Sequence, residues 1–280
     1  MRVKCQPDRN DSTPSSDRVG AHHNRSACAS HSVVTTGHSH ASEGTVGWQQ
    51  QESLVTLTIH RPHAANAYTA SMLAQLDDCL RRIEADPGVA TVVITGAGHW
   101  FCAGADHRER DSRNWLSVVE LPSARVFQRL ARCPAVTIAA INGAAVGGGL
   151  ELALATDLRV ACATATFSLP ELELGLLPAA GGIDRLPALV GPMAARQLIL
   201  AGMVWTAEDA HRLGLILDVT PDEPALRQCV AEYARRIAGR DATALRFAKQ
   251  QLSKDIQMSS DATRLAQALL VGVHSDTTKQ

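Results

Sequence analysis

Two glutamates and a run of glycines carry the chemistry that this sequence could perform. Residues 147–149 are consecutive glycines, and Glu151 follows them closely. Glu171 lies further along the chain, directly after Pro170. Glycines let a ligand approach the main chain, and the unpaired N–H groups at a helix start favour an oxygen that carries negative charge. The pattern predicts a place where an oxyanion is stabilised, with a carboxyl group about one helical turn away to move protons.

The glycine run is expected to lie between a strand and a helix. Residues 135–141 form a continuous apolar and β-branched run that ends at an Asn-Gly pair, which is typical of a buried strand. Residues 150–155 have a helical composition. Taken alone, the triplet would also fit an ordinary tight turn between these elements. A second loop at 100–106, after an expected strand at 90–95, could supply another backbone N–H group to the same place.

The wider chain alternates expected strands and helices, which implies right-handed βαβ crossovers and a mainly parallel sheet. The fold class is therefore α/β. The expected strands span 54–59, 90–95, 136–141 and 158–162, with 166–168 leading to Pro170, and the expected helices span 69–84 and about 115–131. From Gly182 onward only helices are expected.

In this order, the motifs resemble the crotonase family, also called the enoyl-CoA hydratase/isomerase superfamily. The resemblance runs from about Leu54 to about Ser275. It is carried by His60-Arg61-Pro62 with Ala65-Asn66-Ala67, Phe101 to Asp106, Asn142 to Glu151, Pro170-Glu171 with Gly175, Pro178 and Gly181-Gly182, and Thr206 to Ala210 with Leu213-Gly214-Leu215. The resemblance implies a crotonase-like spiral of ββα units and a C-terminal helical region. That region would pack on the spiral and on neighbouring subunits, commonly in a homotrimer or a dimer of trimers.

The resemblance also implies roles for particular residues. Ala105 and Gly148 would form the oxyanion hole by donating their backbone N–H groups to a thioester oxygen. Glu151 would be the base that activates water, and Glu171 the acid that protonates the α-carbon, with the roles reversed for dehydration. Substrate or coenzyme A contacts are implied for Ala65, Ala67, Ala103, Asp106, His107, Gly147 and Gly175. No metal is expected, and no cofactor other than the coenzyme A of the substrate.

Some of these residues also have ordinary structural interpretations. Glu173 lies close to Glu171 and competes with it for the role of the acid. Asp106 and Asp157 are typical of capping or structural acids. Cys102 lies in the second loop but is interpreted as a small buried apolar residue, because no basic residue nearby in the sequence would generate a thiolate.

The predicted activity is that of an enoyl-CoA hydratase-like lyase of fatty acid metabolism, which adds water reversibly across the 2,3 double bond of an enoyl thioester. An enoyl-CoA isomerase is the closest alternative: it would move a proton with Glu171 and leave Glu151 secondary, giving a product without added water. A thioester hydrolase is a further alternative and would release free thiol. From a different class, an RNA-binding relative without catalysis is disfavoured by the intact glutamate pair and the lack of a basic helix.

Two departures from the family pattern concern the nucleotide end of coenzyme A. Ala65 occupies a position where the family often has a basic residue that helps to hold the phosphates. The chain ends at Gln280, before a final segment in which the family usually has a lysine and an aromatic residue near the adenine. These departures suggest weakened nucleotide binding, and an acyl thioester carried by a carrier protein is therefore an alternative substrate.

Composition excludes several classes of protein. A chain of 280 residues with 45% hydrophobic content and a net charge of −1 can bury a full core and has no electrostatic pull towards nucleic acid. Its seven cysteines form no C-x-x-C pair, which favours a reducing, cytoplasmic setting over a disulfide framework. No stretch approaches the ~18 uncharged apolar residues of a membrane helix.

Three regions are expected along the chain. Residues 1–47 are polar and lack apolar periodicity, which predicts a disordered extension. The histidines in this range are irregularly spaced and have no cysteine or carboxylate partners, so a solvated tail is favoured over a metal site. Residues 48–190 are predicted to form the spiral core, and residues 191–280 a helical region that is truncated relative to the family.

Overall fold

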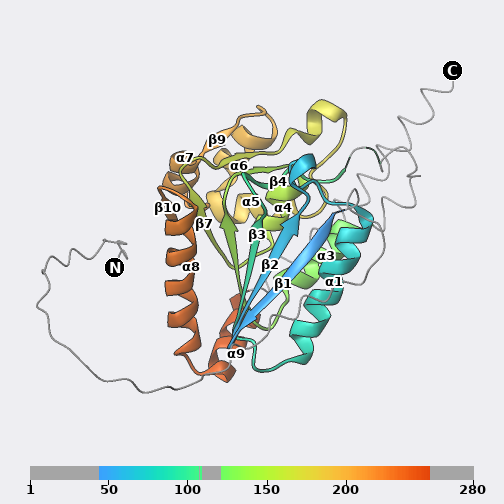
Figure 1. Cartoon of the computed structure of the whole chain (residues 1–280). Coiled ribbons are helices and arrows are strands. Elements are labelled where there is room, and N and C mark those ends of the chain that lie inside the picture. Colours follow the sequence, from blue (N-terminus) through green and yellow to red (C-terminus); the bar gives the residue numbers. More distant parts are fainter. Residues whose placement is uncertain (1–43, 107, 109–120, 253–280) are drawn as a thin grey trace, which may run out of the picture. The chain divides into compact units, whose positions relative to one another are not determined.

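A computed structural model describes residues 44–106, 108 and 121–252 of the chain (Figure 1). Its larger sheet has six strands in the order β1-β2-β3-β5-β7-β10. β1 and β2 pair antiparallel, and all other neighbours in this sheet pair in parallel. The strands are β1 (Thr45–Gln51), β2 (Leu54–His60), β3 (Thr91–Gly96), β5 (Val136–Ile141), β7 (Leu158–Cys162) and β10 (Asp218–Thr220).

A smaller sheet of four short strands lies in the order β4-β6-β8-β9. These strands are β4 (Trp100–Cys102), β6 (Ala144–Val146), β8 (Thr166–Ser168) and β9 (Trp205–Thr206). Along the chain, β3, β5 and β7 of the larger sheet are each followed by a short strand of the smaller sheet and then by a helix. This repeated ββα order matches the expected spiral of ββα units, and the mixed α/β class predicted from the sequence is confirmed.

Helices cover both faces of the larger sheet. The α-helices are α1 (Ala70–Ala85), α3 (Pro122–Ala131), α4 (Gly148–Leu154), α5 (Gly182–Val190), α6 (Pro192–Ile199), α7 (Ala207–Arg212), α8 (Glu223–Ala238) and α9 (Ala242–Leu252), and two 3-10 helices are η1 (Pro62–Ala64) and η3 (Pro170–Leu174). The larger apolar cluster contains α1, α3 and α4, whereas α8 buries Leu226 and Val230 against Ile138 and Val160 in a second cluster.

Strand β5 shows why its sequence is apolar without alternation. Ile138 and Ala140 belong to the cluster under α8, whereas Ala139 and Ile141 belong to the larger cluster on the opposite face. A strand buried on both faces carries mostly apolar side chains, and the one polar residue of β5, Thr137, bonds its hydroxyl to Asp157. The chain continues from the C-terminal end of β5 through β6 of the smaller sheet, and the glycine run follows β6 directly.

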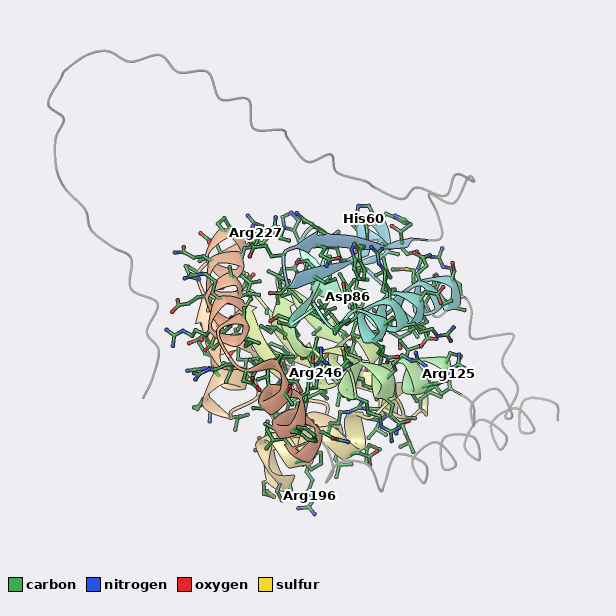
Figure 2. The ribbon with its side chains drawn as sticks, turned by 90° about the horizontal axis from the view of Figure 1, so that it is seen from below. His60, Asp86, Arg125, Arg196, Arg227 and Arg246 are labelled. Atoms are coloured by element: carbon green, nitrogen blue, oxygen red, sulfur yellow. The ribbon has the colours of Figure 1, made fainter. Side chains whose placement is uncertain are left out.

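Helix α9 is tied to the sheet by two long basic side chains. Lys249 donates to the backbone oxygen of Ala135 at 2.7 Å and lies 2.6 Å from Asp157. Arg246 donates to the backbone oxygen of Pro87 at 2.9 Å, and Figure 2 shows α9 crossing this end of the molecule between α8 and α3. Asp157 also accepts hydrogen bonds from the N–H and hydroxyl of Thr137, so its carboxylate has a structural role.

Most element boundaries agree with the expectations. β5 and β7 have the predicted bounds, β2 is one residue longer than predicted, and α1 begins at Ala70 because the Thr69 side chain caps it by accepting from the N–H of Met72. α3 begins at Pro122, and residues 115–120 of that expected helix lie outside the described residues.

Two expectations need correction. The prediction that only helices follow Gly182 is wrong, because β9 and β10 lie beyond it. These strands have two and three residues, too few to show a periodic pattern in the sequence. β1 begins at Thr45, inside the range 1–47 that was expected to lack structure. Its outer residues are exposed and polar, while Val46 and Trp48 pack on the core, and residues 1–43 lie outside the described residues.

None of the helices in the described ranges combines the length and apolar character that crossing a bilayer requires.

Candidate active site

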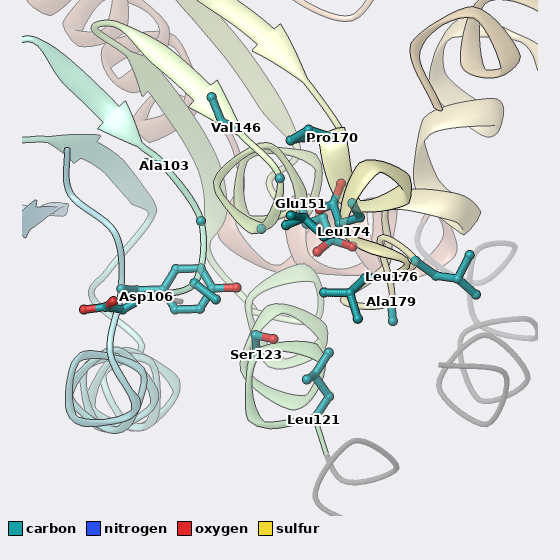
Figure 3. Close-up of a pocket in the computed structure, with 17 residues that line it drawn as sticks. Ala103, Asp106, Leu121, Ser123, Val146, Glu151, Pro170, Leu174, Leu176 and Ala179 are labelled. Carbon is teal, nitrogen blue, oxygen red and sulfur yellow. The ribbon is translucent and has the colours of Figure 1, made fainter. Parts of the chain in front are cut away.

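A pocket forms where the loops of the smaller sheet meet α3, α4 and η3 (Figure 3). Figure 3 shows Glu151, Pro170 and Leu174 grouped at one side of this pocket, with Ser123 and Leu121 of the α3 region across from them. Its lining residues are Tyr68, Ala103, Gly104, Ala105, Asp106, Leu121, Ser123, Val146, Gly147, Gly148, Glu151, Pro170, Glu171, Leu174, Leu176, Leu177 and Ala179.

Glu151 projects into the pocket from the first turn of α4. Its side chain is buried, and its Oε1 accepts the backbone N–H of Gly182 at 2.9 Å. A Cβ atom on Gly182 would lie 3.1 Å from that oxygen and 2.8 Å from Pro178. Burial and the nearby charge of Glu171 raise the pKa of Glu151, although the Gly182 hydrogen bond and the Arg185 charge oppose this rise. Glu151 therefore gives up its proton less readily than an exposed glutamate.

Glu171 enters the pocket from η3, next to Glu151 and the glycine run. A Cβ atom on Gly147 would lie 3.0 Å from its Oε1. Its Oε2 is buried and has no hydrogen-bond partner among residues 44–106, 108 and 121–252. Burial raises the pKa of Glu171 as well. Two carboxyl groups that share a desolvated space do not both ionise easily, so the pair retains a proton at higher pH than isolated glutamates.

The position of Glu173 resolves the competition between the two acids of η3. Glu173 is exposed and does not line the pocket, whereas Glu171 does. Only Glu171 is therefore placed to act together with Glu151.

Backbone pairing with Tyr68 directs the N–H of Ala105 away from the segment that contains Tyr68. Tyr68 donates its N–H to Gly104 at 2.8 Å, and its own backbone oxygen accepts the N–H of Asp106 at 2.9 Å. Successive peptide groups of an extended chain point to opposite sides, so the N–H of Ala105 faces away from Tyr68. Within the described part of the chain, the N–H groups of Ala105 and Gly148 donate to no acceptor.

The glycines bring the two N–H groups to the same wall of the pocket. A Cβ atom on Gly104, whose φ is +91°, would lie 3.1 Å from the backbone nitrogen of Gly148. A Cβ atom on Gly149 would lie 1.9 Å from the backbone oxygen of Cys102. The loop after β4 and the start of α4 are thus in direct main-chain contact, which side chains at these positions would prevent.

The structure brings together most, but not all, of the residues predicted for the site. Ala103, Ala105, Asp106, Gly147, Gly148, Glu151 and Glu171 line the pocket, whereas Ala65, Ala67 and Gly175 do not. Ala65 has a φ of +51°, and its backbone oxygen accepts the N–H of Ala103 at 3.0 Å. Ala65 therefore helps to hold the loop after β4 in place without lining the pocket. Gly175 ends η3 with a left-handed φ of +66°. His107 lies outside the described residues.

Asp106 lies at the pocket, but its carboxylate is engaged by two arginines. Arg61 lies 2.8 Å from its Oδ2 in a buried pair, and Arg108 binds both carboxylate oxygens. The hydrogen bonds from Arg108 and Arg61 hold the pKa of Asp106 well below its usual range. Asp106 therefore remains ionised and anchors the loop that presents Ala105.

Cys102 has no features of a nucleophile. It is fully buried, and its Sγ donates to the backbone oxygen of Asn66 at 3.2 Å. Burial raises the pKa of the Cys102 thiol to about 12, so the thiolate is absent near neutral pH.

Sequence reasoning missed two polar side chains of the pocket, Tyr68 and Ser123. Tyr68 directly follows the Asn66-Ala67 motif and looks like an ordinary core aromatic in the sequence. Ser123 stands near the start of α3, where a serine usually signals only a helix start. Only the chain fold, which packs β4, α3 and α4 around one space, brings both to the pocket.

Comparison with known proteins gives consistent matches. Residues 49–280 match the family model described as enoyl-CoA hydratase/isomerase. The YngF protein of Bacillus subtilis, named for the same family, is 40% identical over 213 residues, which cover 74% of this chain and 81% of YngF. A crotonyl-CoA hydratase of Syntrophomonas wolfei is 35% identical over 228 residues, or 80% of this chain and 87% of the relative. A crystal structure of an enoyl-CoA hydratase from Bacillus anthracis aligns with a TM-score of 0.72 at 34% identity, covering 82% of this chain and 91% of that one.

Proposed function

The chain belongs to the enoyl-CoA hydratase/isomerase family, and we propose that it adds water reversibly across the 2,3 double bond of an enoyl-CoA thioester. It is an enoyl-CoA hydratase-like enzyme. The observation that carries the choice of hydration is the position of Glu151 and Glu171 in the lining of one pocket, beside two unengaged N–H groups.

The thioester oxygen binds between the backbone N–H groups of Ala105 and Gly148. When a nucleophile adds at C3, charge moves through the conjugated system onto this oxygen and forms an enolate. Fixed donors that point at the developing charge lower the barrier, and loss of one such donor typically costs on the order of 10²–10³ in rate. The start of α4 contributes in the same direction, because its N-terminal end carries partial positive charge.

The two glutamates move the protons. Ionised Glu151 accepts a proton from a water molecule as the water oxygen bonds to C3, and protonated Glu171 donates a proton to C2 of the enolate. The net change is the addition of one water, and the reverse sequence removes it. Glu151 gains its proton and Glu171 loses one, so a proton must return to Glu171 before the next turnover. Burial raises the pKa of both groups, so the pair as a whole keeps one proton near neutral pH, which is the protonation state that this exchange requires. The reaction needs no cofactor beyond the coenzyme A of the substrate.

Purified protein with crotonyl-CoA tests this reaction directly. We expect loss of the enoyl-thioester absorbance and a product whose mass has increased by one water. A rearranged product of unchanged mass would identify an isomerase instead, and release of free thiol would identify a hydrolase. The buried position of Glu151 favours hydration over isomerisation, because an isomerase would need only Glu171 for the proton transfer.

A carrier-protein thioester is a second form in which the acyl group could be presented. It is supported by Ala65, which places no positive charge beside the loop after β4. The test compares kcat/KM for a free CoA thioester with that for the same acyl group on a carrier protein. Comparable values would argue against a carrier as the natural donor.

The proposed assembly follows the family expectation, and the proposed location follows the cysteine content of the sequence. We propose a homotrimer or a dimer of trimers in the cytoplasm, acting in fatty acid metabolism. Exposed apolar side chains of the C-terminal region, such as Met193, Leu200 and Val204, support contacts between subunits. Light scattering gives the mass of the assembly, and a monomer at micromolar concentration would reject the trimer.

A further inference from the structure

Tyr68 places a phenol group against the backbone of Gly148. The Tyr68 side chain lines the pocket and is 6% exposed. A Cβ atom built on Gly148 would lie 2.2 Å from Tyr68 Oη, so the hydroxyl oxygen lies directly over the Cα of Gly148. Gly148 is one of the two N–H donors of the proposed reaction, and the hydroxyl therefore sits beside the place where the thioester oxygen binds.

The same residue is linked to the other donor through its main chain. The N–H and C=O of Tyr68 pair with Gly104 and Asp106, on either side of Ala105. Its ring packs edge-on against Phe127 of α3, with centroids 5.8 Å apart and an interplanar angle of 88°. The hydroxyl is therefore held by a fixed backbone and a fixed ring, as a preorganised donor must be.

We propose that the Tyr68 hydroxyl donates a third hydrogen bond to the thioester oxygen of the substrate. This inference rests on the proposed function, because it assumes an enolate at the oxyanion hole. A phenol O–H both donates and accepts, and its hydrogen bond strengthens as negative charge builds on the acceptor. A donor that gains strength in the transition state raises kcat more than it lowers KM. A phenyl ring at this position would keep the contact with Phe127 and lose the hydroxyl.

Tyr68→Phe tests the proposal against a purely packing role. The chain has two tyrosines, and the other, Tyr233 on α8, donates to Asp218 at 2.6 Å away from the pocket lining. Tyr233→Phe is therefore a matched control for removal of one phenol oxygen. We expect Tyr68→Phe to lower kcat for crotonyl-CoA hydration about tenfold while KM changes less than about twofold, and Tyr233→Phe to leave both unchanged.

A second measurement reports the donor without requiring hydration. Acetoacetyl-CoA cannot be hydrated in this way, but its bound enolate absorbs in the near ultraviolet and can be titrated with pH. Loss of a donor to the enolate oxygen should raise the enolisation pKa of the bound ligand by about one unit in Tyr68→Phe and leave it unchanged in Tyr233→Phe. An unchanged enolisation pKa in Tyr68→Phe would overturn the proposal, even if kcat fell. If wild-type protein failed to hydrate crotonyl-CoA, crotonyl-CoA would be rejected as a substrate, while the acetoacetyl-CoA titration would still decide the role of Tyr68.

Discussion

The backbone N–H of Gly182 donates to Oε1 of Glu151 at 2.9 Å and so links the first residue of α5 to the carboxyl group in the pocket. One oxygen of Glu151 is thereby held in place. The positive end of the α5 dipole partly offsets the cost of ionising a buried carboxyl group. The site thus depends on the C-terminal helices as well as on the spiral that carries the glycines.

Glu151→Gln and Glu171→Gln should each lower kcat for crotonyl-CoA hydration at least about a hundredfold, because each amide has nearly the shape of the carboxyl group but transfers no proton. In Glu151→Gln the introduced amide oxygen could still accept the Gly182 N–H, so the fold should be retained. Loss of enoyl-thioester absorbance with time measures the rate. Glu173→Gln is the control, since this exposed acid of η3 does not line the pocket. Equal rates in Glu171→Gln and Glu173→Gln would remove Glu171 from the mechanism.

The pH profile of kcat/KM should be bell-shaped, with both limbs above the ordinary glutamate pKa of 4.5. The active state has one proton on the carboxyl pair. As pH falls through the lower of the two raised pKa values, the base is lost, and as pH rises through the higher one, the acid is lost. Initial rates at low substrate concentration across the pH range measure both limbs. An acidic limb centred near 4.5 would show that the carboxyl groups are not desolvated as a pair.

Much of the architecture could be predicted from the sequence where patterns are long or doubly constrained. β5 and β7 are largely buried and therefore have mostly apolar sequences with clear ends, although β7 contains the buried Arg159. Glu151 and Glu171 could be chosen because the glycine run and the Pro-Glu pair, with the spacing between the two glutamates, match the motifs of the resembled family. The rest of the fold was predicted from the order of the family motifs along the chain.

The parts that could not be predicted depend on contacts between distant segments. β9 and β10 are too short for periodicity and form because β8 and β7 offer them edges to pair with. The contact of Tyr68 with Gly148 follows from how α4 packs beside the segment that precedes α1, where Tyr68 forms an isolated bridge with Ala105, and a core tyrosine has the same sequence signature. The Glu151 hydrogen bond to Gly182 likewise joins residues whose spacing in the sequence suggests no contact.

Stability should depend on pH through Glu151. Its pKa is raised in the folded state above the ordinary value of 4.5, so the folded chain binds more protons than the unfolded chain between these two pKa values. The free energy of unfolding therefore falls as pH rises through this window. Glu151→Gln removes this titration. The free energy of unfolding of the variant minus that of wild type should therefore be roughly 1–3 kcal/mol larger at about pH 8 than at about pH 4.5.

Urea unfolding at both pH values measures this effect on stability. Glu173→Gln provides the comparison, because an exposed side chain should give the same difference from wild type at the two pH values. A stability difference between Glu151→Gln and wild type that did not grow with pH would contradict the raised pKa of Glu151.

Gly149→Ala should destabilise the fold, although alanine usually favours a helix. Helix propensity alone would stabilise the variant by about 1 kcal/mol. However, the added Cβ would lie 1.9 Å from the backbone oxygen of Cys102, and a main-chain atom cannot move aside as a flexible side chain can. Such overpacking costs roughly 1–3 kcal/mol or more, so the steric term outweighs the propensity term. Urea unfolding should show a net loss, and hydration activity should fall because the displaced loop carries Ala105.

Gly47→Ala is the matched control for this substitution. A Cβ atom on Gly47 in β1 would lie 3.6 Å from Thr58, which is ordinary van der Waals contact. Alanine in place of glycine within a strand should stabilise by roughly 0.5–1 kcal/mol, because the unfolded chain loses conformational freedom. The two variants should therefore shift the free energy of unfolding in opposite directions. If Gly149→Ala were as stable as Gly47→Ala, the loop after β4 would not be in main-chain contact with α4, and the placement of the two N–H donors on one wall would lose its support.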